Sequence, residues 1–285
     1  MSSASPSVAL VTISYARDFE RCELLVKTVE RHAQDAFIHY LVVDRRDVTL
    51  FQRLSSPSCK VLVLEDLLPW WIFRTRWSGR FWISLKTLPV RGWIIQQIAK
   101  MSIFAAIPED IAVHCDSDCF FLRSFSLRQL VHTDQGTRLQ LVPFENAERR
   151  RWNETSVRLF GRPASEAAAG SFVGNLIPFR RDVMRILHER LAGQARKSWT
   201  AVLASQLSFS EYSIYGSFVT QILGLEAAGH RIDNTPIMRL GYGLDPSDER
   251  AWHAFFCELG PTDVGAMIHS KDGIEVAQYR RYVLP

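Results

Sequence analysis

Two carboxylates stand two residues apart in the segment HCDSDCFFL, as Asp116-Ser117-Asp118. The apolar run 111–115 (IAVHC) precedes them, and the apolar residues 119–122 follow. Carboxylates spaced i, i+2 where a strand opens into a loop can turn toward one point, which suits a divalent cation that phosphate oxygens also hold. An exposed turn is the alternative, because Asp and Ser are common turn formers. The tight placement between apolar segments favours the cation, because acids at the edge of a core need a charged partner.

The elements that must position this pair alternate between strands and helices in the N-terminal part of the chain. Short apolar, β-branched runs predict strands buried on both faces, and segments with helical spacing predict helices between them. The predicted strands are 8–14, 37–43, 60–64 and 111–115, and the predicted helices are 18–33 and 92–107. This alternation indicates an α/β fold with a mostly parallel sheet flanked by helices. The carboxyl ends of such strands are where these sheets bind ligands.

Beyond residue 125 the pattern is looser. The predicted strands there are 139–144, 171–178 and 266–269, and the predicted helices are 181–192 and 210–228. No internal repeat of fixed period occurs, and no Gly/Ser-rich or Pro-rich linker divides the chain. We therefore expect a single domain over residues 1–285.

Three segments in this order resemble the GT-A fold glycosyltransferases that carry a D-x-D motif. They are Arg91–Lys100 (RGWIIQQIAK), Asp116–Asp118 and Ser210–Gly216 (SEYSIYG). More narrowly, the chain from Val8 to about Tyr215 is similar to a family of largely uncharacterised bacterial glycosyltransferase-like proteins. The resemblance implies a GT-A-like, Rossmann-like sheet, with a nucleotide-sugar-binding half over 1–125 and an acceptor-binding half over 126–285.

The resemblance also implies an activity and assigns residues to it. The implied enzyme is a metal-dependent, hexosyltransferase-like protein that moves a sugar from a nucleotide-sugar to a saccharide or lipid-linked acceptor in cell-surface polysaccharide or glycolipid synthesis. Asp116, Asp118 and His269 would hold Mn²⁺ or Mg²⁺ on the diphosphate. The residues implied to bind the nucleotide and donor are Ser14, Tyr15, Asp18, Asp44, Gln97, Lys100 and Lys271. The residues after His269 depart from the glycine- and tryptophan-containing motif of the best-known family with a C-terminal histidine.

The residue types suit this transfer. A nucleotide-sugar leaves a diphosphate whose growing negative charge a chelated cation and a lysine can stabilise. An inverting enzyme also needs a carboxylate that takes the proton from the acceptor hydroxyl, and Glu211 is the candidate. In the alternative interpretation Ser210 caps a helix and Glu211 interacts with the helix dipole.

The stretch Pro69–Trp93 mixes aromatic and basic side chains. It holds the tryptophans Trp70, Trp71, Trp77, Trp82 and Trp93, interleaved with Arg74, Arg76, Arg80 and Lys86. Such mixing is typical of sugar stacking, an anionic lipid surface or single-stranded nucleic acid, and a loop folded over the core is the alternative. Because the other segments indicate a sugar donor, we favour an acceptor-side or membrane-surface patch.

Composition and charge exclude some classes of protein. Lys and Arg number 34 against 30 Asp and Glu, and a net charge of +4 does not suggest a dedicated nucleic-acid binder. The five cysteines form no CxxC pair, which indicates reduced thiols in a cytosolic protein. No basic and apolar segment before a cleavage site is visible and no apolar run is long enough to span a bilayer, so we expect neither a signal peptide nor a transmembrane helix. We therefore expect a cytoplasmic protein, with peripheral contact to the inner face of the membrane left open.

Two other functions stay open. A nucleotidyltransferase shares the general sheet but needs a glycine-rich loop near its N-terminus, and residues 14–17 (SYAR) contain no glycine. A non-catalytic module that binds carbohydrate or a membrane surface belongs to a different class. Hydrolases find little support, because the chain has no H-E-x-x-H and no G-x-S-x-G motif.

Overall fold

The fold is mixed α/β, in a computed structural model that describes residues 5–75 and 81–284. The largest sheet has five strands in the order β11-β7-β1-β2-β3. Their bounds are β1 Val8–Ser14, β2 Ile38–Val43, β3 Cys59–Val63, β7 Ile111–His114 and β11 Ile177–Arg180. β1 pairs in parallel with β2, whereas β11 pairs antiparallel with β7. This mainly parallel sheet flanked by helices confirms the predicted α/β class and the four predicted N-terminal strands.

The chain divides into two compact units, and each is interrupted in sequence. Unit 1 comprises Met1–Val8, Val63–His114 and Val131–Asn234. Unit 2 comprises Ala9–Leu62, Cys115–Leu130 and Thr235–Pro285. Both units therefore take segments from both of the predicted halves, 1–125 and 126–285.

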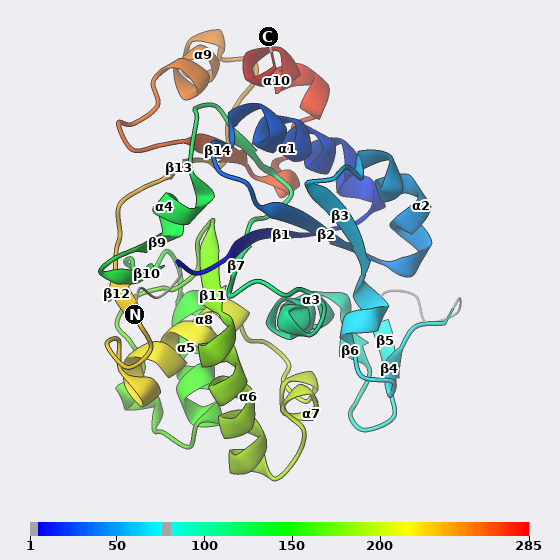
Figure 1. The fold of residues 1–285 in the computed structure, drawn as a ribbon, viewed down its shortest axis with the longest axis vertical. Helices are drawn as coiled ribbons and strands as arrows, with labels where there is room; N and C mark the ends of the chain where they lie inside the picture. The colour runs from blue at the N-terminus through cyan, green and yellow to red at the C-terminus, as the bar shows by residue number, and fades with distance from the viewer. Residues whose placement is uncertain (1–4, 76–80, 285) are drawn as a thin grey trace. The chain divides into compact units, whose positions relative to one another are not determined.

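Unit 2 packs helix α1 against two hydrophobic clusters. Leu24 on one side of α1 packs with C-terminal residues that include Trp252 and Tyr279, and Cys22 and Val26 pack with β2 and α2. Figure 1 shows α1 and α10 side by side. A second sheet has the order β13-β14-β8. Besides strands of the large sheet, this unit contains α1 Phe19–His32, α2 Val48–Phe51, α9 Glu249–Cys257, α10 Val276–Val283, β8 Cys119–Phe121, β13 Met238–Gly241 and β14 Gly265–Ile268.

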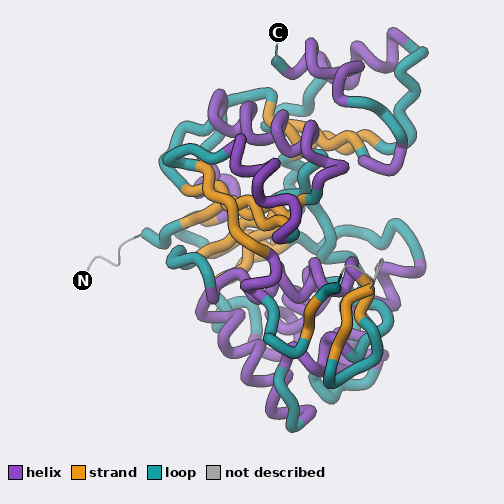
Figure 2. Tube along the Cα trace, turned by 90° about the vertical axis from the view of Figure 1, so that its right-hand side faces the viewer, coloured by secondary structure: helices purple, strands orange, loops and turns teal. Residues whose placement is uncertain are grey.

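Unit 1 is built mainly of helices, which Figure 2 colours purple. Helix α3 contacts α7 and α8, and α5 contacts α8. The helices are α3 Gly92–Ser102, α5 Ala147–Leu159, α6 Arg181–Ala195, α7 Trp199–Ala204 and α8 Glu211–Ser217. The short strands are β4 Ile72–Phe73, β5 Phe81–Ser84, β6 Val90–Arg91, β9 His132–Thr133, β10 Gly136–Leu139 and β12 His230–Ile232. A further helix, α4 Leu127–Val131, lies at the boundary of the two units in sequence. Within the described residues no helix is both long and apolar enough to cross a bilayer.

Several predicted elements differ from the structure. The predicted strand 139–144 is wrong, because β10 ends at Leu139 and the next residues include Pro143, which has no N–H for a ladder. The predicted strand 171–178 starts only at Ile177. The predicted helix 210–228 ends earlier, because a π-helix follows α8 and stops before Gly224, whose φ is +88°.

The described part of the aromatic–basic stretch contains short strands joined by loop residues. Strands β4, β5 and β6 form a small antiparallel sheet there, so the loop interpretation is wrong for these residues. Arg76, Trp77 and Arg80 lie outside the described residues.

Candidate functional site

The Asp116-Ser117-Asp118 motif lies between β7 and β8 and belongs to unit 2. Asp116 is exposed and Asp118 is partly buried. The Oδ2 atom of Asp118 accepts a hydrogen bond from the Ser270 N–H at 3.1 Å, and its carbonyl accepts one from the Ile268 N–H at 3.2 Å. Burial, with the negative charge of Asp116 as the second cause, raises the pKa of the Asp118 carboxyl to about 6. The end of β14 thus holds one carboxylate in an environment where a nearby positive charge would be stabilising.

His269 follows β14 directly and lies near Asp118, with which it interacts electrostatically. The Nδ1 atom of His269 is 3.3 Å from Oδ1 of Asp272, and Oδ2 of Asp272 accepts the Gly243 N–H at 2.8 Å. A carboxylate that orients one ring nitrogen directs the other, here Nε2, toward a ligand, and metal-binding histidines use this arrangement. Lys271 is exposed on the turn after His269.

These side chains suit a hard divalent cation, because carboxylate oxygens and an imidazole are ligands that Mn²⁺ accepts. Among residues 5–75 and 81–284, no three His, Cys, Asp or Glu side chains form a ready-made metal cluster. Mg²⁺ is usually held by one or two protein carboxylates together with substrate phosphates, so a pair of aspartates matches that mode of binding.

The loops after β1 and β2 are tied together in the same unit. The Ala16 N–H donates to Oδ2 of Asp47 at 3.0 Å, which joins the two loops. Asp44 lies in the second loop and pairs with Arg46 at 2.9 Å. In the first loop Tyr15 is exposed and hydrogen-bonds Asp18. Ser14 is only 3% exposed at the end of β1, so its side chain faces the core and not the surface of the loop.

Arg21 connects the first loop to the C-terminal segment. Its guanidinium lies 3.6 Å from Asp18 Oδ1 and donates to the Ile274 carbonyl at 2.7 Å. Tyr279 interacts with both Arg21 and Asp118, and burial is the main reason why its pKa is raised to about 12. Tyr15, Asp18 and Asp118 therefore belong to one polar region of unit 2. Arg21, Ser270 and Tyr279 were not predicted as site residues.

The remaining three candidates, Gln97, Lys100 and Glu211, meet in unit 1. The Lys100 Nζ atom lies 2.9 Å from Glu211 Oε1 and donates to the Tyr212 hydroxyl at 2.8 Å. Gln97 Oε1 accepts the Glu211 N–H at 3.2 Å. Lys100 is 8% exposed and Glu211 is 1% exposed. The predicted donor-binding lysine and the predicted base thus form a buried ion pair with each other.

Glu211 is the first residue of α8, and the cap interpretation holds only in part. Ser210 occupies the N-cap position, but its side chain makes no capping hydrogen bond to the helix backbone. The Ser210 hydroxyl instead donates a hydrogen bond to Glu211 Oε2 at 3.4 Å. Each carboxylate oxygen of Glu211 therefore has its own neighbour, Lys100 for Oε1 and Ser210 for Oε2.

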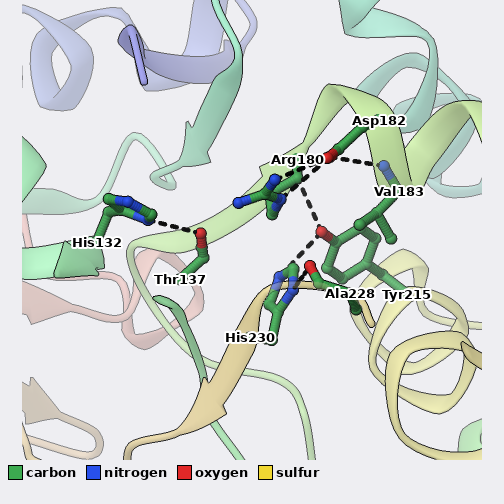
Figure 3. A network of polar contacts seen from close by, with 8 residues as sticks. All are labelled: His132, Thr137, Arg180, Asp182, Val183, Tyr215, Ala228 and His230. Atoms are coloured by element: carbon green, nitrogen blue, oxygen red, sulfur yellow. Dashed lines mark hydrogen bonds and ion pairs between the residues drawn. The ribbon is translucent and has the colours of Figure 1, made fainter. Parts of the chain in front are cut away.

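A buried network in unit 1 fixes α8 four residues after Glu211 (Figure 3). The Tyr215 hydroxyl accepts the Arg180 N–H at 2.9 Å and lies 3.1 Å from Nε2 of His230. Nδ1 of His230 is 2.7 Å from the Ala228 carbonyl, which can only accept, so Nδ1 carries the proton and Nε2 accepts from Tyr215. Burial lowers the pKa of His230 to about 4, which keeps the ring neutral. The network joins α8 to β11 and β12 and so positions the helix that carries Glu211.

The fold and this geometry define an α/β protein with a carboxylate-rich polar region in unit 2 and a buried Lys–Glu pair in unit 1. The chain belongs to the family described as Family of unknown function (DUF6492), which matches residues 7–242. No curated protein matches the chain. The matched region contains Asp116, Asp118, Lys100 and Glu211, and it ends before His269.

Proposed function

We propose that this protein is a metal-dependent glycosyltransferase of the GT-A type. It takes a sugar from a nucleotide-sugar and transfers it to a saccharide or lipid-linked acceptor in cell-surface polysaccharide or glycolipid synthesis. The three segments that resemble such enzymes, and the polar region of unit 2, support the proposal together.

The observation that carries the proposal is the setting of Asp118. Its carboxylate is partly buried beside a second carboxylate, it accepts the Ser270 N–H at 3.1 Å, and it lies near His269. A carboxylate pair at the edge of a core is favourable when a cation compensates the charges. Bound Mn²⁺ or Mg²⁺ would neutralise the charge that develops on the departing diphosphate.

The chain's own residues then bind and orient the donor. Tyr15, Asp18 and Asp44 lie on loops at the ends of β1 and β2, which Asp47 ties together, and these loops offer an aromatic ring and carboxylates for a base and a ribose. Asp272 contacts Nδ1 of His269, so Nε2 is the ring nitrogen that would bind the cation near Asp118. Lys271 is exposed and can approach phosphate oxygens from the turn after β14.

Glu211 is the proposed base for the acceptor hydroxyl. Because Lys100 holds Oε1, the acceptor proton would go to Oε2, the oxygen that now faces the Ser210 hydroxyl. Ser210 would then have to turn away when the acceptor binds. Lys100, in this account, orients the carboxylate instead of contacting the diphosphate.

The test is a thermal-shift titration of the purified chain with UDP and GDP, in Mn²⁺ and in chelator. A nucleotide present at a hundredfold excess over its Kd adds about 2.7 kcal/mol to the stability, which raises the Tm by roughly 5–10 °C. Asp118→Asn should abolish the part of this shift that depends on Mn²⁺, and the Asn amide oxygen can still accept the Ser270 N–H. Asp134→Asn is the matched control, because Asp134 is exposed on the β9–β10 turn.

Each outcome has a definite meaning. A shift that needs Mn²⁺, is lost in Asp118→Asn and is kept in Asp134→Asn supports the proposal. A shift of equal size in chelator overturns the metal site. No shift with either nucleotide in any condition contradicts the glycosyltransferase and favours a non-catalytic module.

A further inference from the structure

A groove of about 560 Å³ opens on unit 1 between two segments that are far apart in sequence. One wall runs from Phe81 at the start of β5 to Ile94 on α3, and the other wall is 204–207, the end of α7 and the residues after it. Most of the lining residues are apolar, Thr87, Ser205 and Gln206 are polar, and Arg91 is the charged residue that lines the groove.

The rim of this groove exposes apolar side chains to an unusual degree. Leu88 on one wall is 79% exposed and Leu207 on the other is 77% exposed. With Trp70 at 78%, they are the three most exposed large hydrophobic side chains among the described residues. Phe81, also on the rim, is 50% exposed. Single exposed leucines are ordinary, but several around one groove indicate a surface that is covered in use.

The two segments that line the groove carry charge of one sign only. No acidic residue occurs between Asp66 and Glu109, and the segment 199–210 that supplies the opposite wall has no charged residue at all. Three described basic residues of the first segment lie in the groove or close to it in sequence, and they are Arg74, Lys86 and Arg91. Lys86 Nζ lies 5.4 Å from the Trp71 ring centroid, and the Arg74 guanidinium lies 5.6 Å from that of Trp82. Aromatic rings thus hold two of the cations on the same small sheet as Phe81.

We infer that this groove and its rim are the surface by which the protein docks on an anionic lipid bilayer. Apolar side chains can enter the boundary between headgroups and acyl chains, while Lys and Arg interact with anionic headgroups. A second copy of the chain is a poorer occupant, because a two-fold interface would bring two patches of the same positive charge together. The inference does not depend on the proposed transferase activity, since it concerns binding alone.

The experiment is sedimentation of the purified full-length chain with vesicles at low salt, about 0.05 M, and at about 0.5 M. Vesicles of phosphatidylcholine with phosphatidylglycerol are compared with vesicles of phosphatidylcholine only. The apolar variant is Leu88→Ser with Leu207→Ser, and its control is Leu240→Ser, a leucine 48% exposed in unit 2. All three are surface side chains, so these variants should fold normally.

A second set of variants tests the charges. It replaces Arg74, Lys86 and Arg91 with Gln, and its matched control replaces the exposed Arg151, Arg190 and Lys197 with Gln. Each lysine or arginine near an anionic surface contributes about 1 kcal/mol, which is roughly a fivefold change in partitioning per residue. The triple groove variant should therefore lose more than tenfold in binding, and the control set clearly less.

Binding to anionic vesicles that falls at high salt, and that both groove variants lose while both controls keep it, supports the inference. Absence of binding at low salt overturns it, as does equal binding by groove and control variants. A concentration-dependent dimer that Leu88→Ser with Leu207→Ser dissociates, without vesicle binding, assigns the groove to a second copy and overturns it too.

Discussion

Glu211→Gln is the substitution whose effect follows most directly from the structure. Glu211 is 1% exposed and its partner Lys100 is 8% exposed, so the substitution removes the charge of a carboxylate that lies 2.9 Å from a buried ammonium. Removing one partner of a buried ion pair costs roughly 3–5 kcal/mol. The Gln oxygen and the Tyr212 hydroxyl can still accept from Lys100, which puts the expected loss near the lower end, about 3 kcal/mol.

The assay is thermal unfolding followed by circular dichroism and by tryptophan fluorescence. For a chain of this size, about 3 kcal/mol lowers the Tm by roughly 6–12 °C. The matched control is Glu189→Gln, because Glu189 and Arg185 form an ion pair whose side chains are 63% and 66% exposed. Exposed pairs contribute little, so this control should change the Tm by less than about 2 °C. The two probes must give coincident transitions for the comparison to measure stability.

A double variant separates the ion pair from other effects of the substitution. Lys100→Met with Glu211→Gln removes both charges, so it should be more stable than the sum of the two single losses predicts, by about 2 kcal/mol. If Glu211→Gln melts within about 2 °C of the natural protein, the buried pair does not stabilise unit 1 as argued. Purely additive losses in the double variant would also refute the reasoning.

Two further predictions concern stability in unit 1. Burial lowers the pKa of His188 to about 4 in the folded chain, against 6.5 in the unfolded chain. As the pH falls below 6.5 the unfolded chain therefore binds the proton first. The contribution of His188 to the free energy of unfolding is fully present above pH 6.5 and is lost toward pH 4. His188→Phe keeps an aromatic ring against Trp199, whose ring centroid lies 3.8 Å from that of His188. The urea midpoint of this variant should fall less between pH 6.5 and pH 4 than that of the natural protein. An equal fall in both proteins contradicts the role given to His188. Gly216→Ala should destabilise by about 1–3 kcal/mol, because a Cβ would lie 2.2 Å from the Phe172 ring. A Cβ added at Gly193 on α6 has no atom within 4 Å, so Gly193→Ala should be neutral or stabilising by up to about 1 kcal/mol. Equal urea midpoints for Gly216→Ala and Gly193→Ala would contradict both expectations.

Local sequence patterns predicted the parts of the fold that local patterns determine. The run VALVTIS is buried along nearly its whole length as β1, because a strand covered on both faces needs apolar residues at every position. Two-residue strands such as β4 and β6 are too short to show alternation, so the small sheet around Phe81 was not predicted. Helix α10 was also missed, although Glu275 and Gln278 form a capping box before it that the sequence contains.

The candidate site was predicted in its residue types more than in its contacts. Asp116-Ser117-Asp118 stands out because acids interrupt an apolar sequence, but nothing local connects Asp118 to Ser270, which is 152 residues later. The same holds for Lys100 and Glu211, which the sequence assigned to different ligands and the structure brings to 2.9 Å. Long-range pairing of this kind depends on topology and has no period in the sequence.

The order β13-β14-β8 has a consequence for how the protein is made. Strand β14, at Gly265–Ile268, lies between the other two, and β8 ends at Phe121. At ribosomal rates of 5–20 residues per second, β8 is synthesised roughly 7–30 s before the strand that pairs with it. Throughout that interval β8 has an open edge, to which another nascent chain can pair, and Asp118 lacks the Ser270 N–H. A chain that stopped at residue 242, where the family match ends, would keep this open edge permanently.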